Sequence, residues 1–168
     1  EKRRSQALTE ALEAKEEYES ESALRTEPAY RASKLDRYLV KYNHNKYSVA
    51  LKRILQEKYG EESVDDEHPT GNGTSIDMRV KTDEIHFIYE IKVYPNIRDC
   101  IREAIGQILE YNYWKRNFGA QRLIIVSENH PEPEAKAYLK YLRETFNLPL
   151  YYQQLSYEAK TPKLGRMV

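Results

Sequence analysis

Two short apolar segments on either side of a polar turn restrict most strongly how this chain can fold. They are Thr74–Val80 (TSIDMRV) and Ile85–Val93 (IHFIYEIKV), and Lys81–Glu84 lies between them. Runs of β-branched and aromatic residues that flank a short polar turn are typical of paired strands. We therefore predict a β-hairpin in the middle of the chain.

The second of these strands carries charged residues on one face. Side chains two positions apart on a strand project from the same face, about 6.6 Å apart. Glu90 and Lys92 therefore point together, on the face of Ile88. The other face takes the apolar residues Phe87, Tyr89, Ile91 and Val93. The alternative is an exposed edge strand on which Glu90 and Lys92 are ordinary solvated charges.

A second acid lies on the neighbouring strand. If Asp77 is opposite Glu90, two carboxylates converge on one point. Carboxylate oxygens are the ligands of hard divalent cations such as Mg²⁺. Lys92 would then be within reach of a water molecule at the cation.

A long amphipathic helix is predicted next, over Asn96–Asn117. It follows Pro95, and Asn96 is suited to cap its first turn. Its apolar stripe consists of Ile97, Ile101, Ala104, Ile105, Ile108 and Leu109. Gln107 and Tyr111 are one turn apart, so they lie on one face about 6 Å from each other.

These residues together resemble the motifs of the PD-(D/E)xK, or restriction-endonuclease-like, nuclease superfamily. The matching positions are Asp77, Glu90-x-Lys92 and Gln107-x-x-x-Tyr111, of which the last pair is similar to that of the exonuclease-like branch. The resemblance covers about Asn45–Tyr152. It implies an α/β restriction-endonuclease-like core of order αβββαβ, with a mixed central sheet flanked by helices. Ile76 stands where the family name has its proline, at a position that is loose within the superfamily.

The resemblance also implies a metal site. Asp77 and Glu90 would bind Mg²⁺, with Mn²⁺ as its substitute, together with the backbone carbonyl of Ile91. The family often adds an acid from the first core helix, predicted at about Tyr47–Tyr59. That helix offers only Glu57, near its far end, and Glu67, just before the hairpin, is the other candidate.

The function implied is hydrolysis of DNA phosphodiester bonds. Lys92 would orient or deprotonate the attacking water, or stabilise the pentavalent phosphorus, while Gln107 and Tyr111 would position the phosphate. An RNA nuclease or a junction resolvase would use the same residues. The competing class is a catalytically inactive nuclease-fold module that binds DNA or a protein partner.

The charge composition limits how nucleic acid could be bound. Lys plus Arg and Asp plus Glu both number 27, so the net charge is zero and a general basic surface is excluded. Phosphate contacts must come from local residues. The candidates expected near the metal end are Arg98, Arg102 and Lys46, for which solvated helix faces are the alternative.

The chain is long enough for one compact domain with its own core, since it has 168 residues. We expect a helical extension or linker over 1–42, the nuclease-like domain over 43–157 and a loose tail over 158–168. The segment Glu1–Glu27 is predicted to be a charge-rich helix that joins an upstream domain or pairs with a second copy in a homodimer.

The location predicted for the protein is cytoplasmic. No signal peptide is apparent, and no apolar run approaches the ~20 residues of a membrane span. Cys100 has no second cysteine to pair with, and its place in the amphipathic helix predicts a buried thiol.

Other segments complete the predicted fold. A helix over Ser33–Tyr42 should end at Asn43–Asn45, where His44 would have a capping or loop role. Gln121–Ser127 is predicted to be a central buried strand and Glu132–Phe146 a covering helix. Pro149–Gln153 is predicted to be a final edge strand.

Overall fold

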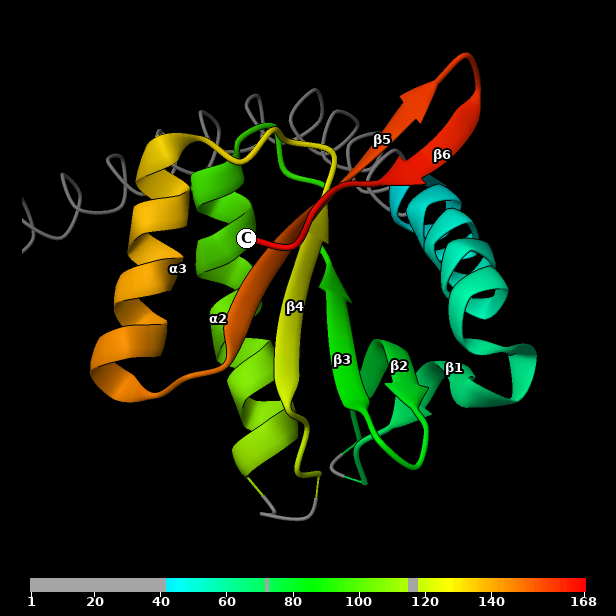
Figure 1. Cartoon of the computed structure of the whole chain (residues 1–168), viewed down its shortest axis with the longest axis horizontal. Helices are drawn as coiled ribbons and strands as arrows, with labels where there is room; N and C mark the ends of the chain where they lie inside the picture. Colours follow the sequence, from blue (N-terminus) through cyan, green and yellow to red (C-terminus); the bar gives the residue numbers. More distant parts are fainter. Residues whose placement is uncertain (1–41, 72, 115–117) are drawn as a thin grey trace, which may run out of the picture. The chain divides into compact units, whose positions relative to one another are not determined.

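The computed structural model describes residues 42–71, 73–114 and 118–168. Within these residues the chain forms a six-stranded sheet with helices on both faces (Figure 1). The compact unit runs from Tyr42 to Val168. The predicted extension over 1–42, including the helix Glu1–Glu27, lies outside the described residues apart from Tyr42 itself.

The architecture is mixed α/β. The strands are β1 (Val64–Pro69), β2 (Ser75–Lys81), β3 (His86–Ile91), β4 (Arg122–Ser127), β5 (Leu150–Glu158) and β6 (Thr161–Leu164). The helices are residues 42–59, the short 3-10 helix η1 (Glu61–Ser63), α2 (Ile97–Tyr113) and α3 (Pro133–Phe146). The strands lie in the order β1-β2-β3-β4-β5-β6. The pairs β3–β4 and β4–β5 are parallel and the other three are antiparallel.

The predicted hairpin is confirmed. Strands β2 and β3 pair antiparallel in a register that sets Met78 opposite Tyr89. The turn between them closes with a hydrogen bond of 2.9 Å from the Thr82 backbone N–H to the Ile85 carbonyl. The Thr82 hydroxyl also accepts from the Ile85 backbone N–H at 3.1 Å. A threonine in the turn thus satisfies backbone groups that the ladder leaves free.

Helix α2 begins where the sequence predicts. The side chain of Asn96 accepts a hydrogen bond of 2.9 Å from the Asp99 backbone N–H, as expected of an N-cap. The helix ends at Tyr113, with Trp114 as its C-cap, so it is shorter than predicted. The last predicted residues, 115–117, lie outside the described part of the chain.

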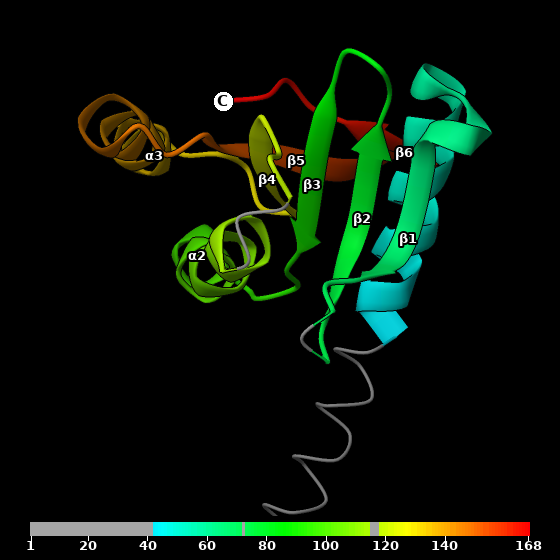
Figure 2. The ribbon, with the colours of Figure 1, turned by 90° about the horizontal axis from the view of Figure 1, so that it is seen from below.

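The sheet has an apolar core on each face. Residues 42–59 pack on one face, while α2 and α3 cover the other, an arrangement visible when Figures 1 and 2 are compared. Strand β3 contributes to both cores by strict alternation. Ile88 lies under α2, whereas Phe87, Tyr89 and Ile91 lie under the helix 42–59. The predicted assignment of its faces is therefore confirmed.

The first core helix extends further than predicted. Residues 42–59 are helical throughout, so Asn43–Asn45 does not interrupt the chain. The preference of Asn43 and Asn45 for a helix cap is a local one, and it does not interrupt the helix here. The position of His44 is set by a contact with Asp77 on β2, which a local reading cannot anticipate.

The C-terminal part is more ordered than the predicted edge strand and loose tail. Strand β5 continues to Glu158 and is paired on both sides, with β4 and β6. Beyond β6, the Val168 backbone exchanges two hydrogen bonds of 3.0 Å with Tyr152. The turn between β5 and β6 places Ala159 and Lys160 at φ 47° and 71°. This turn was missed because it lacks the Gly or Asn that usually adopts positive φ in a hairpin.

Two further strand and helix predictions are confirmed with small changes at their ends. Strand β4 lies inside the sheet and is buried from Leu123 to Ser127. Helix α3, which contacts β5, buries Leu139 and Leu142 in the apolar core on this face of the sheet. Within the described ranges, no helix combines the length and apolar character needed to cross a bilayer.

Candidate active site

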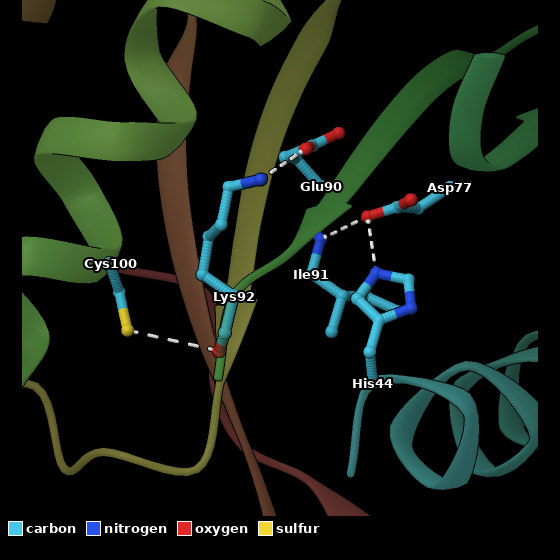
Figure 3. Close-up of polar contacts among 6 residues, drawn as sticks. All are labelled: His44, Asp77, Glu90, Ile91, Lys92 and Cys100. Atoms are coloured by element: carbon cyan, nitrogen blue, oxygen red, sulfur yellow. Dashed lines mark hydrogen bonds and ion pairs between the residues drawn. The ribbon is translucent and has the colours of Figure 1, made fainter. Parts of the chain in front are cut away.

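The predicted acids and lysine meet where β2 and β3 separate (Figure 3). The register of the hairpin ends at Met78 and Tyr89, so the next positions outward are Asp77 and Glu90. Beyond this pair, a side-chain hydrogen bond takes the place of the backbone hydrogen bonds between the strands. Asp77 Oδ2 accepts a hydrogen bond of 2.8 Å from the Ile91 backbone N–H. Asp77 is therefore held beside the strand that carries Glu90. The Ile91 carbonyl as a metal ligand stays a prediction.

Glu90 and Lys92 form an ion pair on the face of β3 under α2. Lys92 Nζ donates to Glu90 Oε1 at 2.6 Å, and Glu90 is only 2% exposed. The other oxygen, Oε2, is buried and has no hydrogen-bond partner among the described residues. Burial raises the pKa of Glu90 to about 7, with a further contribution from the charge of Asp77, while Lys92 opposes the shift.

His44 is a site residue that the sequence analysis assigned to capping or a loop, and that assignment is wrong. Its Nε2 lies 3.2 Å from Asp77 Oδ2. The hydrogen bond to Asp77 raises the pKa of His44, against the effect of partial burial. A signal was present in the sequence, since His44 continues the buried stripe of Tyr47, Leu51 and Leu55 by one turn.

Of the Gln107 and Tyr111 pair, only the tyrosine reaches toward the acids. Tyr111 is 8% exposed, and burial together with the charges of Glu90 and Asp77 raises the pKa of its hydroxyl. Gln107 is exposed, and within the described residues it makes no hydrogen bond to either acid. The one-turn spacing therefore places the two side chains on one helix but not in one environment.

The candidate third acids do not join the pair. Glu57 is exposed and pairs with Arg53 at 3.6 Å. Glu67 is also exposed, in the left-handed conformation with φ 48°, at the β1 position across from Asp77. No group of three or more His, Cys, Asp or Glu side chains in the described ranges is arranged to hold a metal ion.

The three residues predicted to bind phosphate make contacts other than with the two acids, and their role stays a prediction. Arg98 and Arg102 line a groove of about 500 Å³ between α2 and α3. Arg102 is also paired with Asp99 at 2.8 Å. Lys46 Nζ lies 4.4 Å from the ring centroid of Tyr157. Within the described residues, none of the three bonds to Asp77 or Glu90.

The backbone around Lys92 is supported from α2. Cys100 is buried, as predicted, and its Sγ lies 3.7 Å from the Lys92 carbonyl (Figure 3). The Lys92 backbone N–H donates to the Val126 carbonyl at 2.9 Å. The lysine is thus anchored by both its N–H and its carbonyl, which limits the positions that its ammonium group can take.

The residues best suited to hold a cation are the two carboxylates Asp77 and Glu90. Carboxylate oxygens are the usual ligands of Mg²⁺ and Mn²⁺. Glu90 Oε2 fits such an ion, because it is a buried acceptor that has no donor among the described residues. The chain matches no protein-family model, no curated protein and no solved structure.

Proposed function

We propose that this protein is a metal-dependent nuclease that hydrolyses phosphodiester bonds of DNA, built on a restriction-endonuclease-like core. One observation carries the proposal: Glu90 is buried beside Asp77, is bonded to Lys92, and has one oxygen without a partner among the described residues. The order of the first six main elements, αβββαβ, is that of the core implied by the motif resemblance.

The energetics of Glu90 favour a bound cation. Burying a carboxylate without its full set of hydrogen bonds destabilises the folded state by roughly several kcal/mol, because the group loses its contacts with water. Burial raises the pKa of Glu90, and repulsion from the neighbouring carboxylate of Asp77 adds to the shift. A divalent cation would remove both penalties, because it neutralises the two charges and coordinates the free oxygen.

The chain's own groups have separate tasks in this proposal. The Ile91 backbone N–H orients Asp77, and Lys92 holds Glu90 through Oε1, which leaves Oε2 free. The cation, when bound, would lower the pKa of water and offset negative charge on the phosphoryl oxygens. Lys92 supplies a second positive charge where that charge builds up. Tyr111 closes the α2 side of the site and excludes water from it.

A non-catalytic DNA-binding module with this fold is the second candidate. It is favoured by the bonds that already engage the acids, namely Lys92 to Glu90 and His44 to Asp77. A site whose acids are satisfied by protein cations can persist without a metal. The two candidates differ in whether Mg²⁺ binds at Asp77 and Glu90.

Cleavage assays separate these candidates. Purified protein is incubated with linear, circular, single-stranded and branched DNA, and with RNA, in Mg²⁺ or Mn²⁺. We expect metal-dependent cleavage of DNA by the wild type and none by Glu90→Gln, which keeps the shape of the side chain. Glu57→Gln, an exposed acid on the helix 42–59, is the matched control and should cut normally. Equal cleavage by wild type and Glu90→Gln would refute the proposal, as would no cleavage by wild type that binds DNA.

A further inference from the structure

We propose that a single-stranded segment of the substrate lies along β2, held by a phosphate track of Arg79 and Lys81 and by a stacking group of His68, His86 and Phe118. The inference rests on the proposed nuclease function and extends it, because it names the substrate class and the path of the bound strand. It is carried by the register of the sheet, the ring contacts and the charges on one face of β1, β2 and β3.

The track lies on the α2 side of the sheet. Met78 and Val80 are buried under the helix 42–59, so the alternate residues Arg79 and Lys81 project from the opposite face. Arg79 is paired in register with Ile88, which lies two residues before Glu90 on the same face of β3. Along β2, the Cα atoms of Arg79 and Lys81 lie about 6.6 and 13 Å beyond that of Asp77. That spacing suits successive phosphates of an extended strand.

A kink in β1 completes the track. Glu67 has φ 48°, which breaks the side-chain alternation of the strand. As a result His68 lies on the same face as Asp65, with 3.6 Å between Nδ1 and Oδ2. Asp65 also accepts a hydrogen bond of 3.1 Å from Arg79 Nε. The guanidinium is therefore held in place by one edge, and the rest of its donors are left for a phosphate.

Aromatic rings lie beside these cations. The centroid of Phe118 is 5.8 Å from that of His68 and 5.5 Å from that of His86. Burial and the charges of Arg79 and Lys81 lower the pKa of both histidines, so their rings are neutral at pH 7. Neutral rings next to backbone-binding cations are the pattern that binds single strands, since unpaired bases can stack on them. Paired bases of a duplex do not expose their faces in this way.

The acidic turn after β2 marks the end of the track. Asp83 and Glu84 follow Lys81 and are exposed. Their charges repel a polyanion, so the bound strand has to leave the sheet there. We therefore expect one or two nucleotides beyond the cleaved bond to be held between Asp77 and this acidic turn.

Binding without cleavage tests the inference. Fluorescence anisotropy of a labelled single-stranded oligodeoxynucleotide, and of the duplex of the same sequence, is measured with the full chain in EDTA over a series of salt concentrations. The variants are Lys81→Ala, Phe118→Leu and, as the matched control, Lys136→Ala, which removes an exposed lysine from α3. Thermal unfolding checks that Phe118→Leu, whose side chain packs against the core, remains folded.

The wild type should bind the single strand more tightly than the duplex. Lys81→Ala should weaken single-strand binding and reduce the slope of log K against log salt by about 0.7, the loss of one phosphate contact. Phe118→Leu should weaken it by about fivefold or more with the slope unchanged, because a stacking contact is lost. Lys136→Ala should match the wild type.

The outcomes distinguish the two proposals. If the wild type cuts DNA in Mg²⁺ but Lys81→Ala binds like Lys136→Ala, the track is wrong and the nuclease proposal stands. A duplex preference of the wild type would also overturn the single-strand inference. If the wild type neither binds nor cuts any nucleic acid, the proposed function itself fails.

Discussion

Two polar clusters buried in this fold differ in how completely their atoms are hydrogen-bonded. At the ends of β4 and β5, the Tyr152 hydroxyl donates to the Asn129 carbonyl and lies next to Ser127 Oγ, both at 2.6 Å. The Asn129 side chain donates to Ser127 Oγ at 3.1 Å. In the acid cluster, by contrast, Glu90 Oε2 has no partner among the described residues, and burial together with the charge of Asp77 raises the pKa of Glu90.

This difference suits the Tyr152 cluster to a structural role and the Glu90 cluster, in our proposal, to ligand binding. Buried polar groups are normally satisfied, and a satisfied network stabilises one arrangement of the chain. A buried carboxylate that lacks a donor destabilises the folded state instead. The Tyr152 cluster therefore has a structural role, and the Glu90 cluster is the place to expect a bound cation.

The largest effect is expected from Asp77→Asn. This change keeps the shape of the side chain but removes a negative charge, so a cation would bind weakly. Cleavage in Mg²⁺ should fall by about 100-fold or more. Initial rates on a labelled oligonucleotide measure this. Glu144→Gln, which changes an exposed acid on α3, is the control, and an equal loss in both variants would remove Asp77 from the site.

The next effect is a pH dependence of stability in chelator. Because the folded-state pKa of Glu90 is raised from 4.5 to about 7, the folded state holds a proton that the unfolded state has lost. The free energy of unfolding should therefore fall as pH rises from 4.5 to 7, by at most about 3 kcal/mol. Urea titrations across this range should show the fall in the wild type and a flatter profile for Glu90→Gln. Identical profiles would contradict the assigned shift.

Tyr152→Phe should have the opposite signature. It removes a hydroxyl that bonds to Asn129 and Ser127, so both would lose a partner inside the protein. The free energy of unfolding should drop by about 1–3 kcal/mol, with cleavage per folded molecule unchanged. Urea unfolding and cleavage rates are compared in the same preparation. A specific loss of cleavage with no loss of stability would reverse the roles that we assign to the two clusters.

The smallest effect is expected from His44→Gln. Glutamine can still donate to Asp77 but does not carry the positive charge that the raised pKa of His44 favours. Stability in chelator should change by less than about 1 kcal/mol, since the side chain is partly exposed. The affinity for Mn²⁺, measured by calorimetry, should fall by about tenfold if His44 supports the cation site. Unchanged affinity would restrict His44 to the metal-free state.

Much of the acid cluster was predictable because it depends on short-range periodicity. The alternation of β3 sets Glu90 and Lys92 on one face, and their ion pair is observed. The polar turn sets the hairpin register that brings Asp77 to the same end. The Asn96 cap sets the start of α2. Each of these follows from backbone geometry over a few residues.

The long-range contacts of the molecule were not predictable from local patterns. The contact of His44 with Asp77 spans 33 residues, and the exposure of Gln107 depends on how α2 packs on the sheet. The pairing of β5 with β6 uses a turn without glycine. Helix propensity and motif spacing carry no information on such long-range contacts.

Local sequence patterns were enough to predict the hairpin, the amphipathic helix and the pairing of an acid with a lysine on β3. Residues a few positions apart already define those geometries. Three features depend on the packing of the whole domain. His44 contacts Asp77, Glu90 keeps a buried oxygen that has no partner among the described residues, and the C-terminal segment joins the sheet. Those features arise when distant segments compete for the same buried space, and packing of the whole domain settles the competition.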